Sequence, residues 1–312
     1  MTDAKVLKAK GGRQVSRCVW AAVIYLLLFL YLIWVLAPFL VIVLTSLTSN
    51  TEVMATMEFT WFPDEICFDA FREVFVDDYL KSTALPSVVL GFLNTLWMVV
   101  PFTVAGLFVS GLAAFAYSKM RFRLKKPLYA ILLSSMMLPT TVMTIPSYIM
   151  YDTIGWSGTP LPLIIPGLFG NVATIFFLRQ FFSGIPNDIV DAAKIDGLGY
   201  FSIYARIVLP LAKPAFLAQG VFLIVSGYNN YLGPLLYLTE PNLATIQLIV
   251  NQFSSSYLND YPVQCAVALV ALVPLIVVYA FLQKFFIEGI AAPGLKELSL
   301  IHISEPTRLA LM

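Results

Sequence analysis

Residues 191–197 read DAAKIDG and, after a gap of nine residues, residues 207–210 read IVLP. This polar, helix-forming stretch lies between two long apolar segments, so it is expected to lie in water beside a membrane. Asn187 is predicted to cap a helix beginning at Asp188. Gly197 is predicted to end it, because glycine readily takes the left-handed conformation that stops a helix. The stretch therefore indicates a fold organised by a lipid bilayer.

Composition supports a membrane protein. The 312 residues are 59% hydrophobic and 12% charged, whereas soluble domains average about half apolar and about a quarter charged. The net charge of +1 does not indicate nucleic-acid binding. Cys18, Cys67 and Cys265 are scattered, and the one histidine, His302, lies near the end. We therefore expect no disulfide framework, metal site, cofactor or catalytic constellation.

Six apolar segments are long enough to cross a bilayer, since a helix needs roughly 20 apolar residues for a core about 30 Å thick. They cover residues 18–47, 87–116, 127–150, 161–182, 214–237 and 262–287. The first follows a basic stretch, but its apolar run is too long for a secretory signal, so we expect a retained anchor. The sequence predicts an all-α polytopic protein with six transmembrane helices.

Cationic residues predict the orientation of these helices. They fill the link between the second and third segments, lie within or just before residues 183–213 and follow the last segment, whereas the opposite loops contain only Arg72 and Lys81. The positive-inside rule then places both ends of the chain in the cytoplasm, N-in and C-in. Residues 1–17 become a cytoplasmic N-terminal segment, 183–213 a cytoplasmic segment, and 48–86 an external loop.

The external loop 48–86 is rich in Asp and Glu. These acids are expected mainly to keep the loop solvated, because acidic residues contribute little to topology. The pattern around Phe71–Phe75 predicts a short amphipathic helix within a small structured cap.

The motifs at 191–197 and 207–210 resemble the E-A-A-x3-G-x9-I-x-L-P signature of permease subunits of ATP-binding-cassette (ABC) importers, with Asp191 replacing the usual Glu. Further matches resemble the carbohydrate-uptake, maltose-permease-like group. They read SLT at 46–48, NTL at 94–96, FFLRQFF at 176–182 and YNNYLGPL at 228–235. Together they cover most of residues 20–296, so we take 18–296 as the permease domain. Residues 297–312 do not resemble the family.

The resemblance implies a type I importer permease fold surrounded by membrane lipid. It implies four partner subunits: a second permease, two cytoplasmic ABC ATPases and an extracytoplasmic solute-binding protein. It also implies that the helix 188–196 couples the permease to an ATPase, with alanines allowing close approach. The expected coupling residues are Asp191, Ala192, Ala193, Asp196, Gly197, Ile207, Leu209 and Pro210. The alternative for this helix is an amphipathic loop helix at the membrane surface.

Polar residues inside the spans usually face a bundle interior or a water-filled cavity. Amides and rings together suit a sugar, which offers hydroxyls and C–H faces. The expected substrate-path residues are Tyr228, Asn229, Asn230, Tyr231 and Asn94. Tyr228 stands where many sugar permeases have Trp, and the alternative for the cluster is a structural helix break beside Gly233-Pro234. For Asn94 the alternative is an interhelical hydrogen bond.

These observations favour an ATP-driven import subunit for a sugar or oligosaccharide. The chain lacks the phosphate-binding G-x4-G-K-[ST] loop, so its ATPase would be a separate subunit. An ion-coupled carrier would be expected to carry acidic or basic residues at mid-span. The alternative solute within the same architecture is a non-sugar such as glycerol phosphate, a peptide or a polyamine.

The predicted topology can be tested by labelling cysteines on intact cells with a membrane-impermeant thiol reagent. The three native cysteines are first replaced, because Cys67 itself lies in the 48–86 loop. We then expect modification of Ser82→Cys, because that loop is external, and no modification of Ser202→Cys in the 183–213 segment. Labelling of Ser202→Cys and protection of Ser82→Cys would reverse the orientation.

Overall fold

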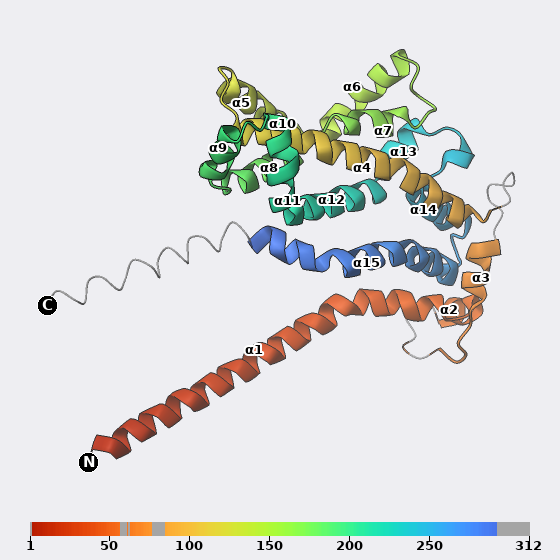
Figure 1. Cartoon of the computed structure of the whole chain (residues 1–312). Helices are drawn as coiled ribbons and strands as arrows, with labels where there is room; N and C mark the ends of the chain where they lie inside the picture. The colour runs from red at the N-terminus through yellow and green to blue at the C-terminus, as the bar shows by residue number, and fades with distance from the viewer. Residues whose placement is uncertain (1, 57–60, 62, 77–84, 292–312) are drawn as a thin grey trace. The chain divides into compact units, whose positions relative to one another are not determined.

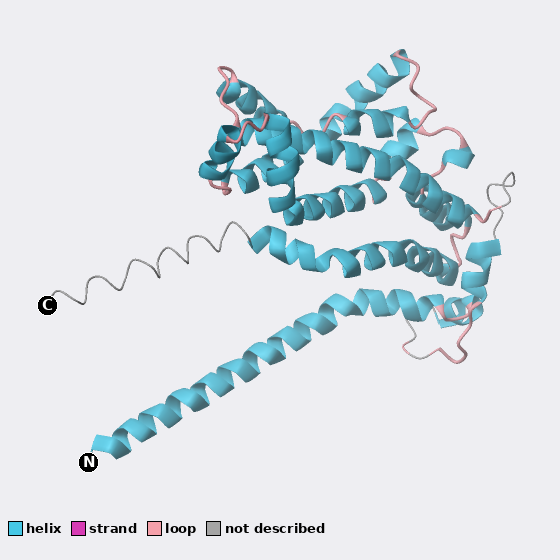
Figure 2. Ribbon diagram, viewed as in Figure 1, coloured by secondary structure: helices cyan, strands magenta, loops and turns pink. Residues whose placement is uncertain are grey.

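The computed structural model describes residues 2–56, 61, 63–76 and 85–291, which form helices and connecting turns without strands (Figures 1 and 2). Ser82 and the tail 297–312 lie outside these described residues. The elements are α1 Thr2–Ser46, α2 Asn50–Thr56, α3 Asp69–Val76, α4 Ser87–Lys119, α5 Lys125–Ser135, α6 Thr140–Thr153, α7 Leu161–Leu168, α8 Val172–Ser183, α9 Asn187–Ile195, α10 Tyr200–Ile203, the π-helix η1 Tyr204–Val208, α11 Leu209–Leu211, α12 Lys213–Tyr228, α13 Leu232–Tyr237, the 3₁₀ turn η2 Pro241–Leu243, α14 Ile246–Ser256 and α15 Tyr261–Ala291.

The candidate membrane-spanning helices overlap the segments that the sequence predicts, except that the fifth begins at Tyr200, inside the segment 183–213 expected in the cytoplasm. Within the described residues, four helices are long and apolar enough to cross a membrane: Val19–Ser46, Ser87–Lys119, Leu161–Ser183 and Tyr261–Gln283. Two further pairs qualify if each bent pair is one span: α5 with α6, bent by 94°, and α10–α11 with α12, bent by 81°. Counting both pairs gives the expected six.

The fifth span differs in detail from the apolar run 214–237. Helix α12 ends at Tyr228, and a separate short helix, α13, begins at Leu232. The break falls at Asn229–Tyr231, where the backbone N–H of Leu235 bonds to the Tyr231 carbonyl (3.0 Å). Broken helices are tolerated at membrane depth when protein groups or a wet cavity satisfy the freed polar atoms.

The described chain divides into two compact units, and the first contains residues 1–76 and 253–270. The short amphipathic helix predicted around Phe71–Phe75 is confirmed as α3, which buries Ala70 and Val74. The hydroxyl of Tyr257 donates to Glu73 Oε1 (3.0 Å). Cys67 Sγ donates to Asp69 Oδ2 (3.0 Å), and this hydrogen bond raises the pKa of the Cys67 thiol.

The second unit contains residues 77–252 and 271–312, and α4 is its central helix. Helix α4 packs against α7, α8 and α12 (Figure 1). Gly106 permits one of these approaches, because a Cβ built there would lie 2.6 Å from the Gly167 carbonyl oxygen of α7. Small residues allow such close backbone contacts between membrane helices, where the hydrophobic effect supplies little attraction.

We therefore expect Gly106→Val to force α4 away from α7. Overpacking of a well-packed interior costs about 1–3 kcal/mol, so the thermal unfolding midpoint and the yield of the detergent-solubilised protein should fall. Gly199→Ala is the matched control, because its φ is −71° and a Cβ there meets nothing within 4 Å. An unfolding midpoint for Gly106→Val equal to that of Gly199→Ala would contradict the proposed tight contact.

Candidate functional site

The DAAKIDG stretch forms the helix α9 and the turn that ends it. The prediction that Asn187 caps this helix was wrong. Pro186 occupies the cap position and makes no side-chain cap bond. Asn187 Oδ1 instead accepts a hydrogen bond from Lys119 Nζ (2.9 Å), which also donates to the Ile185 carbonyl (2.5 Å). Lys119, the last residue of α4, therefore holds the start of α9.

The predicted helix stop at Gly197 is confirmed. Its φ is +81°, a conformation that costs glycine little and other residues more. The N–H of Gly197 bonds to the Lys194 carbonyl and that of Leu198 to the Ala193 carbonyl, both at 3.0 Å. This pair of bonds is a Schellman motif, which satisfies the last carbonyls of α9 and fixes where the helix ends.

Helix α9 has one buried side and one exposed side. Val190 and Ala193 are only 2% and 4% exposed, within a hydrophobic cluster formed by α4, α8, η1 and α12. Ala193 was expected on an open docking face, and this placement corrects that expectation. Its small side chain lets α9 lie close to its own chain.

The exposed side of α9 carries Asp188, Asp191, Ala192 and Ile195. Ile195 is 88% exposed. Helix α9 is not among the candidate membrane-spanning helices, so lipid is not expected to cover this large apolar side chain. Asp191 Oδ1 pairs with Lys194 Nζ (3.0 Å) at the surface, where such pairs contribute roughly 0–1 kcal/mol. Asp196, the C-cap residue, is also exposed.

The IVLP motif forms the helical turn that leads from α9 into the fifth span. Leu209 N–H bonds to the Tyr204 carbonyl, five residues back, so Tyr204–Val208 is a π-helix. A wider turn suits this position, because Pro210 has no N–H to continue an ordinary ladder. Ile207 and Leu209 pack against the cluster that buries Val190 and Ala193, whereas Pro210 is exposed. The helical turn continues through Pro210 to Leu211.

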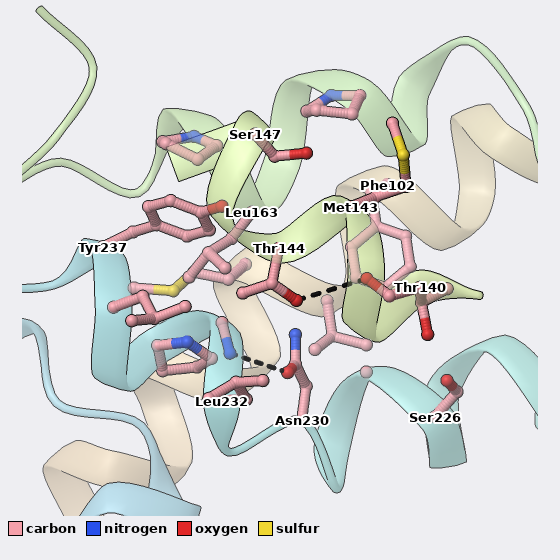
Figure 3. A pocket seen from close by; sticks show the side chains of 18 of the residues that line it. Phe102, Thr140, Met143, Thr144, Ser147, Leu163, Ser226, Asn230, Leu232 and Tyr237 are labelled. Atoms are coloured by element: carbon pink, nitrogen blue, oxygen red, sulfur yellow. Dashed lines mark hydrogen bonds between the residues drawn. The ribbon is translucent and has the colours of Figure 1, made fainter. Parts of the chain in front are cut away.

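A cavity of about 840 Å³ lies between α4, α5, α6, α7, α12 and α13 (Figure 3). Small-molecule sites in proteins commonly enclose about 300–1,000 Å³. Its polar lining residues are Thr95, Ser135, Thr140, Thr141, Thr144, Ser147, Tyr151, Asn171, Ser226, Asn230, Tyr237 and Thr245. The cavity is therefore large enough for a small solute and rich in hydroxyl groups.

Helix α6 supplies a stripe of hydroxyls to this cavity. Thr140, Thr144, Ser147 and Tyr151 all line it, and their spacing of four, three and four residues puts them on one helix face. The Thr144 hydroxyl donates to the Thr140 carbonyl (3.2 Å; Figure 3). Val142, Ile145 and Ile149 on the other side are exposed. This stripe is absent from the residues predicted from the sequence, although its helical spacing is a signal that the sequence carries.

Aromatic rings form one wall of the cavity. Tyr237 stacks on Tyr148, with ring centroids 6.1 Å apart, and meets Tyr151 edge-on at 5.4 Å. Tyr151 in turn stacks on Trp156 at 5.8 Å. Because Tyr151 and Tyr237 line the cavity, they provide the aromatic surface that the sequence analysis assigned to Tyr228.

Asn230 is the expected path residue that the structure places at the cavity. Its Oδ1 accepts from the backbone N–H of Gly233 (3.1 Å), and Figure 3 shows its amide nitrogen directed towards Thr144. A Cβ on Gly233 would lie 2.8 Å from Asn230 Nδ2. The glycine therefore leaves room for the amide in this position.

The remaining expected path residues lie outside the cavity lining. Tyr228 is 3% exposed, and its hydroxyl donates to the Ala271 carbonyl (2.5 Å), so it packs inside the unit. Asn229 is exposed and accepts from Gln247 Nε2 (3.3 Å). Tyr231 is half-buried. Tyr228 is thus corrected to a packing position because its hydroxyl finds a backbone partner.

Asn94 is buried and bonded on both sides of its amide. Its Nδ2 donates to the carbonyls of Asn242 (2.8 Å) and Ala244 (3.0 Å), while its Oδ1 accepts from Trp97 Nε1 (3.2 Å). These bonds hold the loop around η2 against α4. Asn94 therefore fits its alternative, a structural hydrogen bond, better than a place on the solute path.

A family model described as "Binding-protein-dependent transport system inner membrane component" matches residues 106–291, from within α4 to the end of α15. The chain belongs to this family. It is therefore a multi-pass inner membrane component of a transport system, a transport component rather than a catalyst.

Individual relatives agree with this assignment. The permease is 31% identical over 211 residues to the arabinooligosaccharides transport system permease protein of Bacillus subtilis, covering 66% of this chain and 73% of that one. It is 28% identical over 219 residues to the lactose transport system permease protein of Rhizobium radiobacter, covering 70% and 80%. A chain from the crystal structure of a bacterial ABC transporter involved in import of the acidic polysaccharide alginate shares the fold, with a TM-score of 0.73, 24% identity and coverage of 87% and 98%.

The contrast between Asn230 and Tyr228 gives a testable prediction. Asn230→Ala removes a cavity amide, so uptake per folded complex should fall several-fold; the lost bond to the Gly233 N–H should also lower the unfolding midpoint, by about 1 kcal/mol in stability. Tyr228→Phe removes a buried hydroxyl and leaves the Ala271 carbonyl without that donor, which costs about 1–3 kcal/mol. Its unfolding midpoint should fall, with uptake per folded complex retained. The reverse pattern would return Tyr228 to the solute path.

Proposed function

We propose that this permease forms half of the translocation path of an ATP-driven, binding-protein-dependent importer for a sugar or oligosaccharide. Its partners are a second permease subunit, two cytoplasmic ABC ATPase subunits and an extracytoplasmic solute-binding protein. Residues 18–296 act as one permease domain in this assembly. The 183–213 segment faces the ATPases and the 48–86 loop lies on the opposite side of the membrane.

The observation that carries the sugar assignment is the combination of hydroxyls, an amide and aromatic rings around one cavity. Hydroxyl and amide groups exchange hydrogen bonds with sugar hydroxyls, in both the donor and the acceptor sense. Tyr151 lines the cavity and is half-buried, so its ring can offer an apolar surface to the C–H face of a sugar, and the buried Tyr237 ring packs against it edge-on. The arabinooligosaccharide and lactose permeases named above are relatives of matching chemistry.

The alternative is the same architecture for a non-sugar solute such as glycerol phosphate or a polyamine. Neither of these solutes offers the flat C–H face that a pyranose ring presents to an aromatic side chain. The ring pair at Tyr151 and Tyr237 therefore favours a sugar.

Coupling to the ATPase is proposed to run through the exposed side of α9. Ile195 and Ala192 form a small apolar surface there, flanked by Asp188 and Asp191, and a groove on the ATPase would bury it. The opposite side of α9 is packed on the cluster that contains Phe115 of α4 and Phe182 of α8. A push on α9 would thus reach the ends of two spans through close-packed side chains, which resist compression.

Ile195→Asp tests this docking surface. A buried interface side chain can contribute about 2 kcal/mol or more, so ATPase association should weaken by at least about tenfold. Because Ile195 is exposed within the free permease, its abundance and unfolding midpoint should stay near wild type. The measurements are co-purification of the ATPase subunits and hydrolysis stimulated by the solute-loaded binding protein.

Two further variants control that experiment. Ile195→Leu keeps the apolar contact and should retain coupling. Ala193→Asp places a charge in the buried cluster, so it should reduce the amount of folded permease instead of acting on docking alone. Normal coupled uptake by Ile195→Asp at normal abundance would exclude α9 as the coupling helix.

A further inference from the structure

We propose that the cavity acts as a charge filter: it admits uncharged, hydroxyl-rich solutes and disfavours sugar acids, sugar phosphates and cationic solutes. This inference rests on the proposed function and deepens it by naming the solute class. The relatives do not decide between charged and neutral solutes. The structural neighbour is from a transporter involved in import of an acidic polysaccharide, whereas the lactose permease is named after a neutral sugar.

The lining is the first observation. Among the residues that the structure describes, those that line the cavity are all uncharged. Asp152 and Glu240 come closest to it along the chain, next to Tyr151 and a few residues after Tyr237. Both are exposed and neither belongs to the lining. The electrostatic character of this wall is therefore set by hydroxyl, amide and ring dipoles.

The second observation is that the wall offers hydrogen-bonding atoms to a neutral solute. The Nδ2 of Asn230 points into the cavity while its Oδ1 is held by Gly233. The hydroxyl-bearing residues Thr140, Ser147 and Ser226 also line the cavity and are exposed or half-buried. The wall therefore offers hydrogen-bonding groups beyond the Asn230 amide.

Desolvation disfavours a charged solute in a cavity with this lining. An ionised group that enters a partly apolar cavity loses water, and the loss is costly unless an opposite charge replaces it. Hydroxyls and one amide can replace the hydrogen bonds of a neutral sugar, but they supply no counter-charge. A neutral solute should therefore enter more readily than an anion or a cation of the same size.

The test measures the charge preference of the cavity without requiring the identity of the solute. Cys18, Cys67 and Cys265 are replaced, and a single cysteine is placed at Ser226, an exposed lining residue. The assembled transporter, with the other subunits also made cysteine-free, is treated with three methanethiosulfonates of similar size. These carry a neutral hydroxyethyl group, an anionic sulfonatoethyl group or a cationic trimethylammonioethyl group.

Rates at Ser226→Cys are normalised to those at Thr239→Cys, an exposed position outside the cavity lining. The normalised rate of the neutral reagent should exceed both ionic rates by about tenfold, which corresponds to about 1.4 kcal/mol. A normalised rate for either ionic reagent that equals or exceeds the neutral rate would overturn the proposal.

A second variant keeps the test independent of simple crowding. Asn230→Asp is isosteric and keeps the oxygen that accepts from Gly233, but it places a carboxylate in the cavity. The cationic reagent should then gain on the anionic reagent at Ser226→Cys by about tenfold, with no change at Thr239→Cys. An unchanged ratio would show that size, and not charge, controls entry and would overturn the filter.

The reagents react without transport, so the two proposals fail separately. Equal reagent rates alongside normal ATP-driven uptake would remove the charge filter and leave the importer function intact. A clear neutral preference alongside uptake that is indifferent to Asn230→Ala would retain a neutral cavity but separate it from the translocation path.

Discussion

The close packing of α4 against its neighbours is the constraint on which the rest of the second unit depends. One part of this helix supplies Thr95 and Phe102 to the cavity, and its far end supplies Phe115 to the cluster beneath α9. Glycine makes the contacts possible along its length. A Cβ on Gly91 would lie 2.9 Å from Ile249 Cγ1, and one on Gly111 would meet Tyr204 and Phe216. The single helix α4 therefore joins the cavity to the cluster beneath α9.

Broken helices explain how a cavity can exist inside so apolar a bundle. Each break frees backbone groups that must find partners, because the hydrocarbon offers none. Asn171 caps α8 through the Thr174 N–H (3.1 Å), and its own N–H bonds to Ser110 Oγ of α4 (2.9 Å). At the break before α13, Asn230 Oδ1 likewise accepts a hydrogen bond from the backbone N–H of Gly233, three residues later. Polar residues at the breaks thus stabilise the fold and also line the cavity.

Much of this architecture could be predicted from the sequence, because a bilayer fixes the length and apolar character of a span. The position of α9 and its stop at Gly197 followed from local backbone chemistry, which needs few distant contacts. Predictions that depended on tertiary partners fared less well. Asn187 has the right chemistry for a cap, yet its Oδ1 accepts a hydrogen bond from Lys119 Nζ instead. Tyr228 lies in a polar motif, yet the Ala271 carbonyl binds its hydroxyl inside the unit. These hydrogen-bond partners are distant in the sequence, so no local sequence pattern indicates them.

The two sides of α9 differ in packing. Val190 and Ala193 lie in a closed hydrophobic cluster, whereas Ile195 on the other side is exposed. Under the proposed coupling, a force applied to the exposed side would be transmitted through these close-packed side chains. Lys119 of α4 also holds the start of α9, since its ammonium group donates hydrogen bonds to the Ile185 carbonyl and to Asn187 Oδ1. Motion of α9 towards or away from α4 would strain those two bonds. The π-helix Tyr204–Val208 lies between α9 and α12, and such irregular turns inside helices are frequent at functional sites.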